Sequence, residues 1–416
     1  MKARSLADWL EYIERQHPRP IALGLERVAE VQAKLKIALA CPVITVGGTN
    51  GKGSTCAMLE SILHAAGYRV GLYTSPHIAR YNERVRIAGA EASDAALAAA
   101  FEAVEAARGE VPLTYFEFGT LAALVLLSRE KLEAAVLEVG LGGRLDAVNI
   151  VDADCAVLTS IGIDHVEFLG DTRAAIGREK AGIFRAGRPA IVAEPQIPES
   201  VLEEIKKAKA RPLLIGHDFG FTNQGTQWSY WGPSGKRSGL AHPALRGAVQ
   251  LRNASAALAA LDSLRERVPV AMQDVRRGLG EVSLPGRFQV LPGRPQVVLD
   301  VAHNPQAAAV LAQNLADGGF APETIAVFGM LRDKDIAGVV RAVAPRITRW
   351  HLASLPGPRG ADSRFLSDVF SELKIKEPAI EHPSVSAALA AAKKEAREND
   401  KIVVFGSFLT VAGAYG

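Results

Sequence analysis

Residues 43–55, VITVGGTNGKGST, combine the residue types that bind a phosphate group. Glycines let main-chain N–H groups close on phosphate oxygens, the N-terminus of the helix expected next adds partial positive charge, and Lys52 adds a full one. The spacing departs from GxxxxGK[ST], because Val46 and Gly53 stand where that pattern needs a glycine and a hydroxyl, and the hydroxyl follows at Ser54. These residues predict a phosphate-binding loop. The alternative is a glycine-rich turn that only closes a strand–helix unit.

Polar residues follow the apolar strands expected next along the chain. Glu138 breaks the apolar run AAVLEV near the end of an expected strand, where a carboxylate costs desolvation unless it is paired or binds a metal. We expect Mg²⁺ rather than a structural ion pair there, since a strand-end acid commonly holds Mg²⁺ in nucleotide-binding domains. Ser75 and His165 also follow strands, and the carboxyl edge of a parallel sheet is where open α/β sheets bind ligands. His165 is interpreted either as a ligand or as a structural histidine.

Three other features carry weaker chemical signals. The glycine-dense stretch at residues 140–149, GLGGRLDAVN, is suited to enclosing a small ligand. Phe116 lies on an apolar helix expected over residues 114–129, where an aromatic side chain is commonly core. Lys180 follows Glu179 on another expected helix, and by itself this pattern indicates a charged pair on a solvated face.

Two α/β domains are expected to position these residues. Residues 1–283 predict a P-loop-containing domain with a parallel sheet and a small β excursion over residues 219–249. Residues 284–288, LPGRF, break the helical pattern and are interpreted as a linker. Residues 289–416 then alternate strand and helix, which predicts a smaller Rossmann-like domain with a mainly parallel sheet of about five or six strands. Polar strand ends in both domains favour a site completed by closure.

Composition excludes several classes of protein. Among 416 residues, 48 are Lys or Arg and 45 are Asp or Glu, and a net charge of +3 gives no strong field for nucleic acid or an anionic membrane. The opening residues predict an amphipathic helix, without the apolar run of a signal peptide or transmembrane span. Cys41, Cys56 and Cys155 have no CxxC spacing, so we expect a cytoplasmic protein without disulfides or structural zinc.

Motifs along the whole chain resemble those of one enzyme family, the bacterial dihydrofolate and folylpolyglutamate synthases. These enzymes are ATP-dependent amide ligases of the Mur ligase superfamily. The matching runs occur in family order: GTNGKGST, YTSPHI, TYFEFGTLAAL, EVGLGGRLDAVN, TSIGIDHVEFLG, IGREKAGI, PGRF, DVAHNP and GMLRDKDI.

The resemblance implies sites for ATP and metal ions. ATP would be held by Asn50, Gly51, Lys52, Gly53, Ser54 and Asn253, and from the second domain by Arg287 and Asp300. Ser75 and Glu138 would bind one Mg²⁺ and His165 a second, and K⁺ or another monovalent cation is a further candidate. Lys180 matches the lysine that the family carries as an N6-carboxylate, and the catalytic set would be Lys52, Lys180 and His165.

The resemblance also implies a site for the pterin acid. That site would comprise Ile21, Ala22, Leu23, Gly24, Thr114, Tyr115, Phe116, Glu117, Leu145, Asp146 and Ala147, with Phe116 as a stacking wall. One departure is visible near the end, where the family often has GSFHTV and this chain has GSFLTV, with Leu409 in place of histidine. No role of that histidine is therefore transferred.

The activity implied is the addition of L-glutamate to 7,8-dihydropteroate, followed by γ-linked glutamates on reduced folates such as tetrahydrofolate. An acyl phosphate would activate the acid, and the family implies a monomer. One rival is a ligase of cell-wall nucleotide precursors, but roughly 40 residues before the phosphate loop leave no room for the additional domain that such ligases carry. A second rival is a P-loop switch or motor. The chain has no NKxD element for guanine, and a second polar-edged sheet is unexplained by that function.

Overall fold

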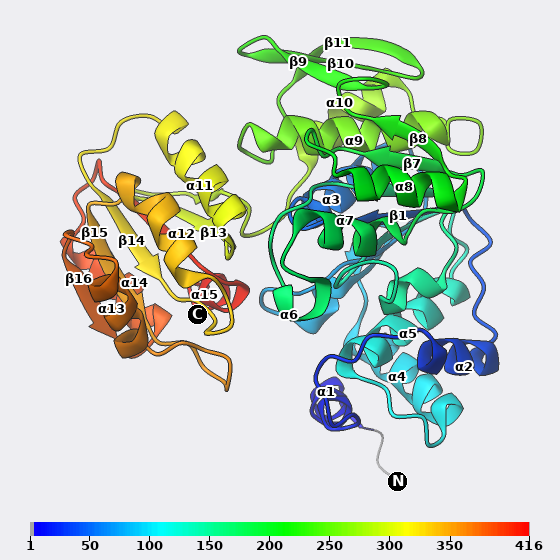
Figure 1. Ribbon diagram of the computed structural model, residues 1–416, viewed down its shortest axis with the longest axis horizontal. Coiled ribbons are helices and arrows are strands. Elements are labelled where there is room, and N and C mark those ends of the chain that lie inside the picture. Colours follow the sequence, from blue (N-terminus) through cyan, green and yellow to red (C-terminus); the bar gives the residue numbers. More distant parts are fainter. Residues whose placement is uncertain (1–3, 416) are drawn as a thin grey trace. The chain divides into compact units, whose positions relative to one another are not determined.

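The computed structural model of the chain describes residues 4–415, which fall into two compact units (Figure 1). The first unit comprises residues up to 162, residues 167–244 and residues 251–282. The second comprises residues 163–166, residues 245–250 and the chain from residue 283 onward. The three cysteines are buried and free. Across residues 4–415, every helix is too short or too polar to span a lipid bilayer.

An eight-stranded sheet forms the centre of the first unit, in the order β4-β3-β2-β5-β1-β6-β7-β8. The strands from β2 to β8 in this order are parallel, and β3 and β4 pair antiparallel at one edge, so the expected parallel α/β sheet is confirmed. Its strands are β1 (Val43–Gly47), β2 (Val70–Tyr73), β3 (Val85–Ile87), β4 (Ala90–Glu91), β5 (Ala134–Glu138), β6 (Cys155–Leu158), β7 (Pro189–Val192) and β8 (Arg211–Leu214).

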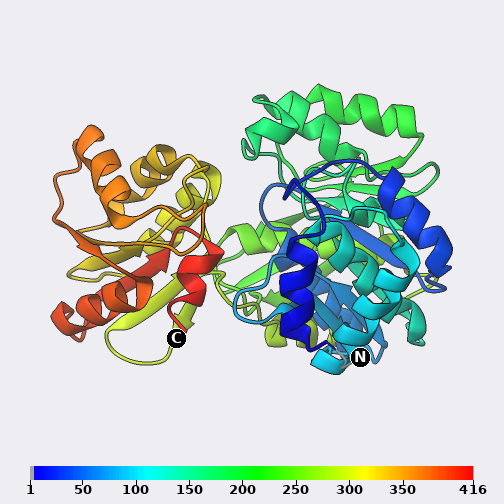
Figure 2. The ribbon, with the colours of Figure 1, turned by 90° about the horizontal axis from the view of Figure 1, so that it is seen from below.

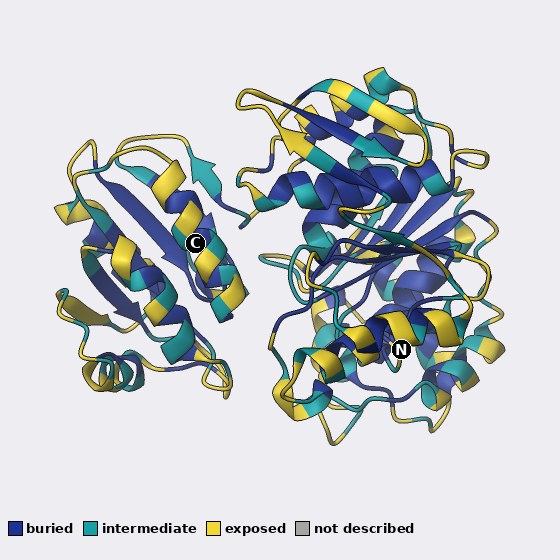
Figure 3. Ribbon diagram, turned by 45° about the horizontal axis from the view of Figure 1, so that its top comes forward, coloured by how far each residue is buried: buried dark blue, intermediate teal, exposed yellow. Residues whose placement is uncertain are grey.

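Helices cover both faces of this sheet (Figure 1). They and the short 3₁₀ turns are α1 (Leu6–Glu14), α2 (Glu26–Leu35), α3 (Lys52–Ala65), η1 (Tyr81–Arg84), α4 (Asp94–Arg108), α5 (Tyr115–Arg129), η2 (Ala147–Ile150), α6 (Val166–Leu169), α7 (Arg173–Ala181), α8 (Glu199–Ala208), α9 (Val249–Ser263) and α10 (Met272–Glu281). The central strands β1 and β5 are buried along their whole length, because helices exclude water from both of their faces (Figure 3). The sequence predicts a helix over residues 93–109 capped by Ser93, and Ser93 caps α4, since its side chain accepts from the N–H of Ala96.

A three-stranded antiparallel sheet confirms the expected β excursion. It comprises β9 (Gly220–Asn223), β10 (Gln227–Gly232) and β11 (Gly235–Ala241). Asp262 near the end of α9 ties this sheet to the unit, because it accepts a hydrogen bond from the Tyr230 hydroxyl at 2.8 Å and pairs with Arg237 at 2.7 Å.

A six-stranded sheet forms the second unit, in the order β12-β13-β17-β14-β15-β16. This sheet belongs to the part of the chain coloured yellow to red in Figure 2. All its pairings are parallel except that of β12 with β13. The expected strands are confirmed, and the short edge strands β12 and β16 were not anticipated individually. The elements are β12 (Gln289–Leu291), β13 (Gln296–Asp300), α11 (Pro305–Asp317), β14 (Thr324–Phe328), α12 (Ile336–Val343), η3 (Ala344–Arg346), β15 (Arg349–Ala353), α13 (Ser363–Glu372), β16 (Ala379–His382), α14 (Val385–Glu395), β17 (Lys401–Phe405) and α15 (Phe408–Ala412).

Two histidines and a carboxylate form a chain at the β15–β16 edge of this second sheet. Nε2 of the buried His351 lies 2.6 Å from Oε1 of Glu395, and its Nδ1 lies 2.8 Å from Nε2 of His382. Burial lowers the pKa of His382 from its ordinary value, and the neighbouring His351 lowers it further. His382 is therefore harder to protonate in the folded protein than in the unfolded protein.

Acid is expected to destabilise the second unit through His382. The unfolded chain binds this proton more readily than the folded chain, so the free energy of unfolding falls as the pH drops through the ordinary histidine pKa of about 6.5. Calorimetric unfolding at about pH 7.5 and about pH 5.5 measures the effect. The variant His382→Gln keeps a donor for His351 but does not titrate, so its unfolding temperature should fall less between the two pH values. An equal fall in both proteins would contradict this assignment.

Candidate active site

The predicted phosphate loop connects β1 to α3 and adopts a conformation that depends on two glycines. Gly48 has φ +148° and Gly51 has φ +88°, both in the region that favours glycine. The sequence predicts a helix over residues 55–64, but α3 begins three residues earlier, at Lys52, with Gly51 as its N-cap. Lys52 therefore lies in the first helical turn, where main-chain N–H groups without intrahelical partners point out of the helix.

The loop is held by hydrogen bonds to the segment that follows β6. The N–H of Thr49 donates to the Ser160 carbonyl at 2.8 Å, and the N–H of Asn50 donates to the Ser160 hydroxyl at 2.9 Å. The Thr159 hydroxyl donates to the carbonyl of Asn50 at 2.7 Å. A Cβ at Gly48 would lie 2.0 Å from Oγ1 of Thr159, so these segments pack too closely for any other residue there. The loop is therefore rigid in its backbone.

Two lysine ammonium groups converge on one carbonyl oxygen of this loop. Nζ of Lys52 donates to the carbonyls of Gly48 and Thr49 at 3.1 and 3.2 Å. Nζ of Lys180, which extends from α7, donates to the same Gly48 carbonyl at 3.1 Å. Lys180 is buried, which corrects the interpretation from pattern alone that it lies on a solvated helix face. Together the two cations and the N-terminus of α3 form a positive centre suited to phosphate.

The expected metal ligands Ser75 and Glu138 lie together at the carboxyl ends of neighbouring strands. The N–H of Ser75 donates to Oε2 of Glu138 at 3.2 Å, and Glu138 is buried. A hydroxyl and a carboxylate fit Mg²⁺, which takes few protein ligands and completes its shell with water and phosphate oxygens. Within residues 4–415 no group of three or more acidic, histidine or cysteine side chains forms a metal-binding cluster. A metal ion at this pair therefore needs oxygens from the nucleotide.

Asn253 on α9 lies directly against the loop. A Cβ at Gly51 would come 2.7 Å from Oδ1 of Asn253, and Asn253 is buried. The sequence-predicted residues of the first unit that the structure brings together at the loop are therefore Asn50, Gly51, Lys52, Gly53, Ser54, Lys180 and Asn253.

The three segments expected to hold the pterin acid also lie together in the first unit. The N–H of Gly24 donates to the Leu145 carbonyl at 3.4 Å, which joins residues 21–24 to the 140–149 loop. Phe116, at the start of α5, lies against Gly140 of that loop, because a Cβ there would come 2.4 Å from its Cζ. Phe116 is only partly buried, unlike a core aromatic. This agrees with a stacking surface.

Asp146 shapes the 140–149 loop from within. Its two carboxylate oxygens accept from the N–H groups of Leu141 at 2.7 Å and Val148 at 2.9 Å. Burial raises the pKa of Asp146 to about 6, although these hydrogen bonds and Lys52 oppose the rise. The Asp146 side chain therefore holds the loop of residues 140–149 in its conformation.

Asp300 and Arg287, the expected nucleotide contacts of the second unit, are adjacent to each other. Asp300 ends β13 and accepts from the N–H groups of Phe288 at 2.9 Å and Ala302 at 2.8 Å. Burial raises the pKa of Asp300, and the N–H of Ala302 and the charge of Arg287 oppose the rise. The Arg287 guanidinium lies 5.1 Å from the centre of the Phe408 ring. Asp300 thus fixes the turn that presents Arg287.

Asp164 belongs to the second unit, and a group of charged and polar side chains of that unit surrounds its carboxylate. Nζ of Lys334 donates to its Oδ1 at 2.6 Å, Nδ2 of Asn304 donates to its Oδ2 at 3.2 Å, and His303 lies nearby. Burial alone raises the pKa of Asp164, but His303 and Lys334 outweigh it and hold that pKa well below its usual range. Lys334, His303 and Asn304 lie in the motifs DVAHNP and GMLRDKD, but the sequence alone predicted no role for them. Their positions just after β13 and β14 were the available signal.

His165, the expected second metal ligand, belongs to this group. Its Nε2 lies 3.2 Å from Nζ of Lys334, and its backbone has φ +51°. A metal ion on Nε2 would have to displace that ammonium group, so the arrangement in the structure does not fit a metal at His165. Leu409, which replaces the family histidine, is 43 % exposed on α15.

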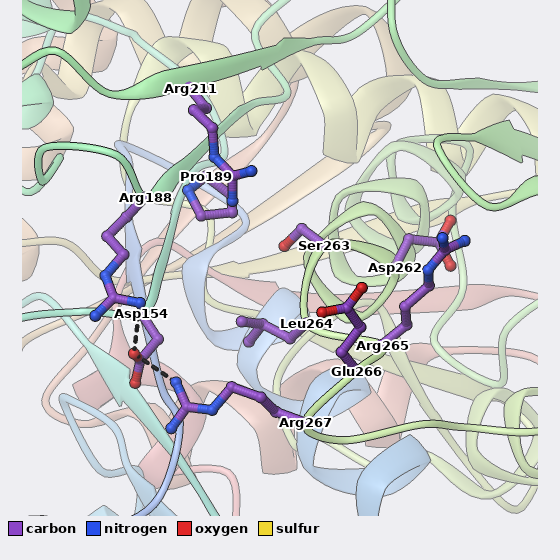
Figure 4. Close-up of a pocket in the computed structure, with 10 residues that line it drawn as sticks. All are labelled: Asp154, Arg188, Pro189, Arg211, Asp262, Ser263, Leu264, Arg265, Glu266 and Arg267. Atoms are coloured by element: carbon purple, nitrogen blue, oxygen red, sulfur yellow. Dashed lines mark hydrogen bonds and ion pairs between the residues drawn. The ribbon is translucent and has the colours of Figure 1, made fainter.

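A cavity of about 260 Å³ at the opposite edge of the first sheet is not part of the phosphate site (Figure 4). It lies where β6, β7 and β8 begin, and Arg188 and Arg267 point to Asp154 at 3.3 and 2.6 Å. Asp154 in turn accepts from the N–H of Val43. These charges therefore pair with one another and fasten the start of β1.

Comparisons with known proteins place the chain among Mur ligases. The model of the Mur ligase middle domain matches residues 46–261, and that of the Mur ligase glutamate ligase domain matches residues 286–408. The chain is 45 % identical over 411 residues to dihydrofolate synthase/folylpolyglutamate synthase of Escherichia coli K12, covering 99 % of this chain and 94 % of that protein.

Solved structures agree with this similarity. E. coli FolC in complex with DHPP and ADP superposes with a TM-score of 0.94 at 44 % identity, covering 99 % of this chain and 97 % of that one. The bifunctional folylpolyglutamate synthase/dihydrofolate synthase of Yersinia pestis, complexed with AMPPNP and Mn ion, gives 0.91 at 45 % identity with the same coverage.

Replacing Gly48 by alanine is expected to weaken nucleotide binding while leaving the fold intact. The added Cβ would collide with Thr159 and force the loop away from its backbone geometry, so the affinity for ATP should fall at least about tenfold. Calorimetric titration with ATP measures the change. Gly67→Ala is a matched control, because Gly67 also has a positive φ of +89° but a Cβ there meets nothing within 4 Å. Equal loss in both variants would show that steric contact with Thr159 is irrelevant.

Proposed function

The chain belongs to the Mur ligase superfamily and, within it, to the dihydrofolate synthase/folylpolyglutamate synthase family, and from this premise we propose that it joins L-glutamate to a pterin acid at the cost of ATP. It is an ATP-dependent acid–amino-acid ligase. The first acceptor is 7,8-dihydropteroate, which becomes dihydrofolate, and the later acceptors are reduced folates that receive γ-linked glutamates. The observation that carries the proposal is the convergence of Lys52 and Lys180 on the glycine loop.

The chemistry requires activation of the acid, because a carboxylate is a poor electrophile toward an amine. Transfer of the γ-phosphoryl group of ATP to a carboxylate oxygen gives an acyl phosphate and ADP. The free amino group of glutamate then attacks the acyl carbon, and the tetrahedral intermediate expels phosphate and loses a proton. Lys52 offsets the charge of the phosphate oxygens that would otherwise repel the incoming carboxylate.

Ser75 and Glu138 are proposed to hold Mg²⁺, which when bound would neutralise phosphate oxygens of the nucleotide. The Mn ion and AMPPNP in the Yersinia pestis relative support a divalent ion with ATP. A second Mg²⁺ at His165, which the family resemblance implies, would require Lys334 to leave Nε2 of His165. K⁺ or another monovalent cation is proposed as a further cofactor, so the assay buffer should contain one.

Lys180 is proposed to carry a carboxylate group. Its neutral amine would attack CO₂, form an N–C bond and release a proton, which leaves an anionic carbamate in place of a cation. Nζ of Lys180 lies 3.1 Å from the Gly48 carbonyl, which Lys52 also contacts, so the carbamate would lie beside the phosphate loop. The carbamate oxygens would supply further hard ligands beside the metal ion.

The other expected assignments complete the proposal. Residues 1–283 would bind ATP and the pterin acid, residues 284–288 would link the domains, and residues 289–416 would form the glutamate ligase domain, with Arg287 and Asp300 at the nucleotide. The match of residues 286–408 to the glutamate ligase domain supports this assignment. A monomer acting in the cytoplasm is also proposed, and three buried free cysteines agree with a reducing compartment.

Turnover with two acceptors tests the proposed function. Purified protein with ATP, Mg²⁺ and L-glutamate should convert 7,8-dihydropteroate to a product one glutamyl residue heavier, and should also extend tetrahydrofolate, as read by mass spectrometry. Phosphate release should require both the pterin acid and glutamate. Hydrolysis of ATP that needs neither would contradict the proposal and favour a P-loop switch.

Lys180→Ala is expected to lose most of the ligase activity, because the loop loses a partner of Gly48 and the site loses its proposed carbamate. Added short carboxylates should restore part of the rate by supplying the missing oxygens. Lys206→Ala, a lysine on the surface helix α8, is the control and should keep normal activity. Full activity in Lys180→Ala would exclude the proposed role.

A further inference from the structure

We infer that Arg27 is a positioning residue that holds the substrate loop of residues 21–24 in its binding conformation, an inference that rests on the proposed pterin site. Arg27 lies in the first turn of α2, directly after that loop. No motif of the sequence singled it out. Its importance follows from three contacts made by one guanidinium group.

Arg27 connects two of the segments assigned to the pterin acid. Its Nη2 donates to the carbonyl of Ala22 at 2.7 Å and to Oε1 of Glu117 at 2.7 Å. Its Nε lies 3.2 and 3.3 Å from the two carboxylate oxygens of Glu117. The guanidinium therefore links the backbone of the 21–24 loop to the N-terminus of α5.

Glu117 is itself fixed by the N-terminus of α5. Its Oε2 accepts from the N–H of Thr114 at 2.8 Å, and its own N–H donates to the Thr114 hydroxyl at 3.2 Å, which is a capping box. Arg27 is therefore bonded, through Glu117, to the first turn of α5, which also contains Tyr115 and Phe116. Phe116 is the proposed stacking wall. A shift of this ion pair would move both sides of the site.

The third segment is joined to the same loop. The N–H of Gly24 donates to the carbonyl of Leu145, so residues 21–24 are held by Arg27 at one end and by the 140–149 loop at the other. Gly24 has φ +140°, and a Cβ there would lie 2.8 Å from Oε2 of Glu26. The loop is therefore bent tightly between two attachments.

Burial and helix electrostatics distinguish the Arg27–Glu117 ion pair from a solvent-exposed pair, which contributes little to stability. The side chain of Glu117 is 5 % exposed and that of Arg27 is 24 % exposed, so removal of either charge leaves the other poorly solvated. A cation in the first turn of α2 is also unfavourable with the helix dipole, while Glu117 in the first turn of α5 is favourable. Glu117 accordingly compensates the placement of Arg27, and that placement is what brings the guanidinium to Ala22.

Lysine cannot replace this arrangement. The ammonium of a lysine ends near the position of the arginine Cζ, so it can pair with Glu117 but does not extend to the Ala22 carbonyl as well. Arg27→Lys therefore keeps the positive charge beside Glu117 but removes the hydrogen bond to the Ala22 carbonyl. It also leaves the buried Glu117 with a partner, so the variant should fold.

The first experiment compares steady-state kinetics of Arg27→Lys with those of the wild type. The KM for 7,8-dihydropteroate should rise about ten- to a hundredfold, whereas the KM for ATP should stay within about twofold, because the phosphate loop is untouched. Arg27→Ala should show at least the same rise in KM and a lower unfolding temperature. Equal changes in both KM values would overturn the inference, since they would indicate general damage.

Arg108→Ala is the matched control. Arg108 is likewise paired with a glutamate, Glu105, and also donates to the Val111 carbonyl and to Gln16, but it contacts none of the three pterin segments. Its loss should lower the unfolding temperature without changing the KM for 7,8-dihydropteroate. A rise in that KM equal to the rise in Arg27→Lys would reduce Arg27 to a purely structural role.

Amide hydrogen exchange without any substrate separates this inference from the proposed function. Arg27→Lys should exchange faster than the wild type at residues 22–25 and unchanged at the phosphate loop. Faster exchange there with an unchanged KM for 7,8-dihydropteroate would contradict the substrate role of the loop. Unchanged exchange would contradict the hold by Arg27. Absence of turnover in the wild type would instead count against the proposed function.

Discussion

The structure depends on the close packing of a glycine loop against the end of a neighbouring strand. Gly48 lies so near Thr159 that no side chain fits between them, and Ser160 holds the next two N–H groups of the loop. Because the backbone is fixed in this way, the Gly48 carbonyl has a defined position and accepts hydrogen bonds from both Lys52 and Lys180. A positive centre built before the nucleotide arrives needs no reorganisation during phosphoryl transfer.

Buried carboxylates elsewhere in the chain follow a related rule, in that each is held by N–H groups or cations. Asp146 accepts from two backbone N–H groups within its loop, Asp300 from two around its turn, and Glu117 from one N–H and a guanidinium. These hydrogen bonds order the segments that carry the proposed site residues. Burial would otherwise make the charged forms of these carboxylates too costly to keep.

Much of this organisation was predictable from local sequence. The glycine-rich loop after an apolar strand, the Ser93 cap and the acid at the end of β5 each depend on a few consecutive residues. The start of α3 was placed three residues late, because a left-handed Gly51 can begin a helix without a side-chain cap. Strands β12 and β16 were missed because three or four residues carry too little periodicity to be distinguished from a loop. Arg27 and Glu117 are 90 residues apart and Lys334 and Asp164 are 170 apart, so only tertiary structure could pair them.

The central claim is that the phosphate loop serves to activate a carboxylate. It can be tested by following oxygen from 7,8-dihydropteroate whose carboxyl group carries ¹⁸O, with ATP, Mg²⁺ and L-glutamate, and by measuring the isotope in the released phosphate by mass spectrometry or ³¹P NMR. Attack of the carboxylate on the γ-phosphorus predicts one labelled oxygen in phosphate for each amide bond formed. Amide formation accompanied by unlabelled phosphate would show that the acid is never phosphorylated, and would contradict the account.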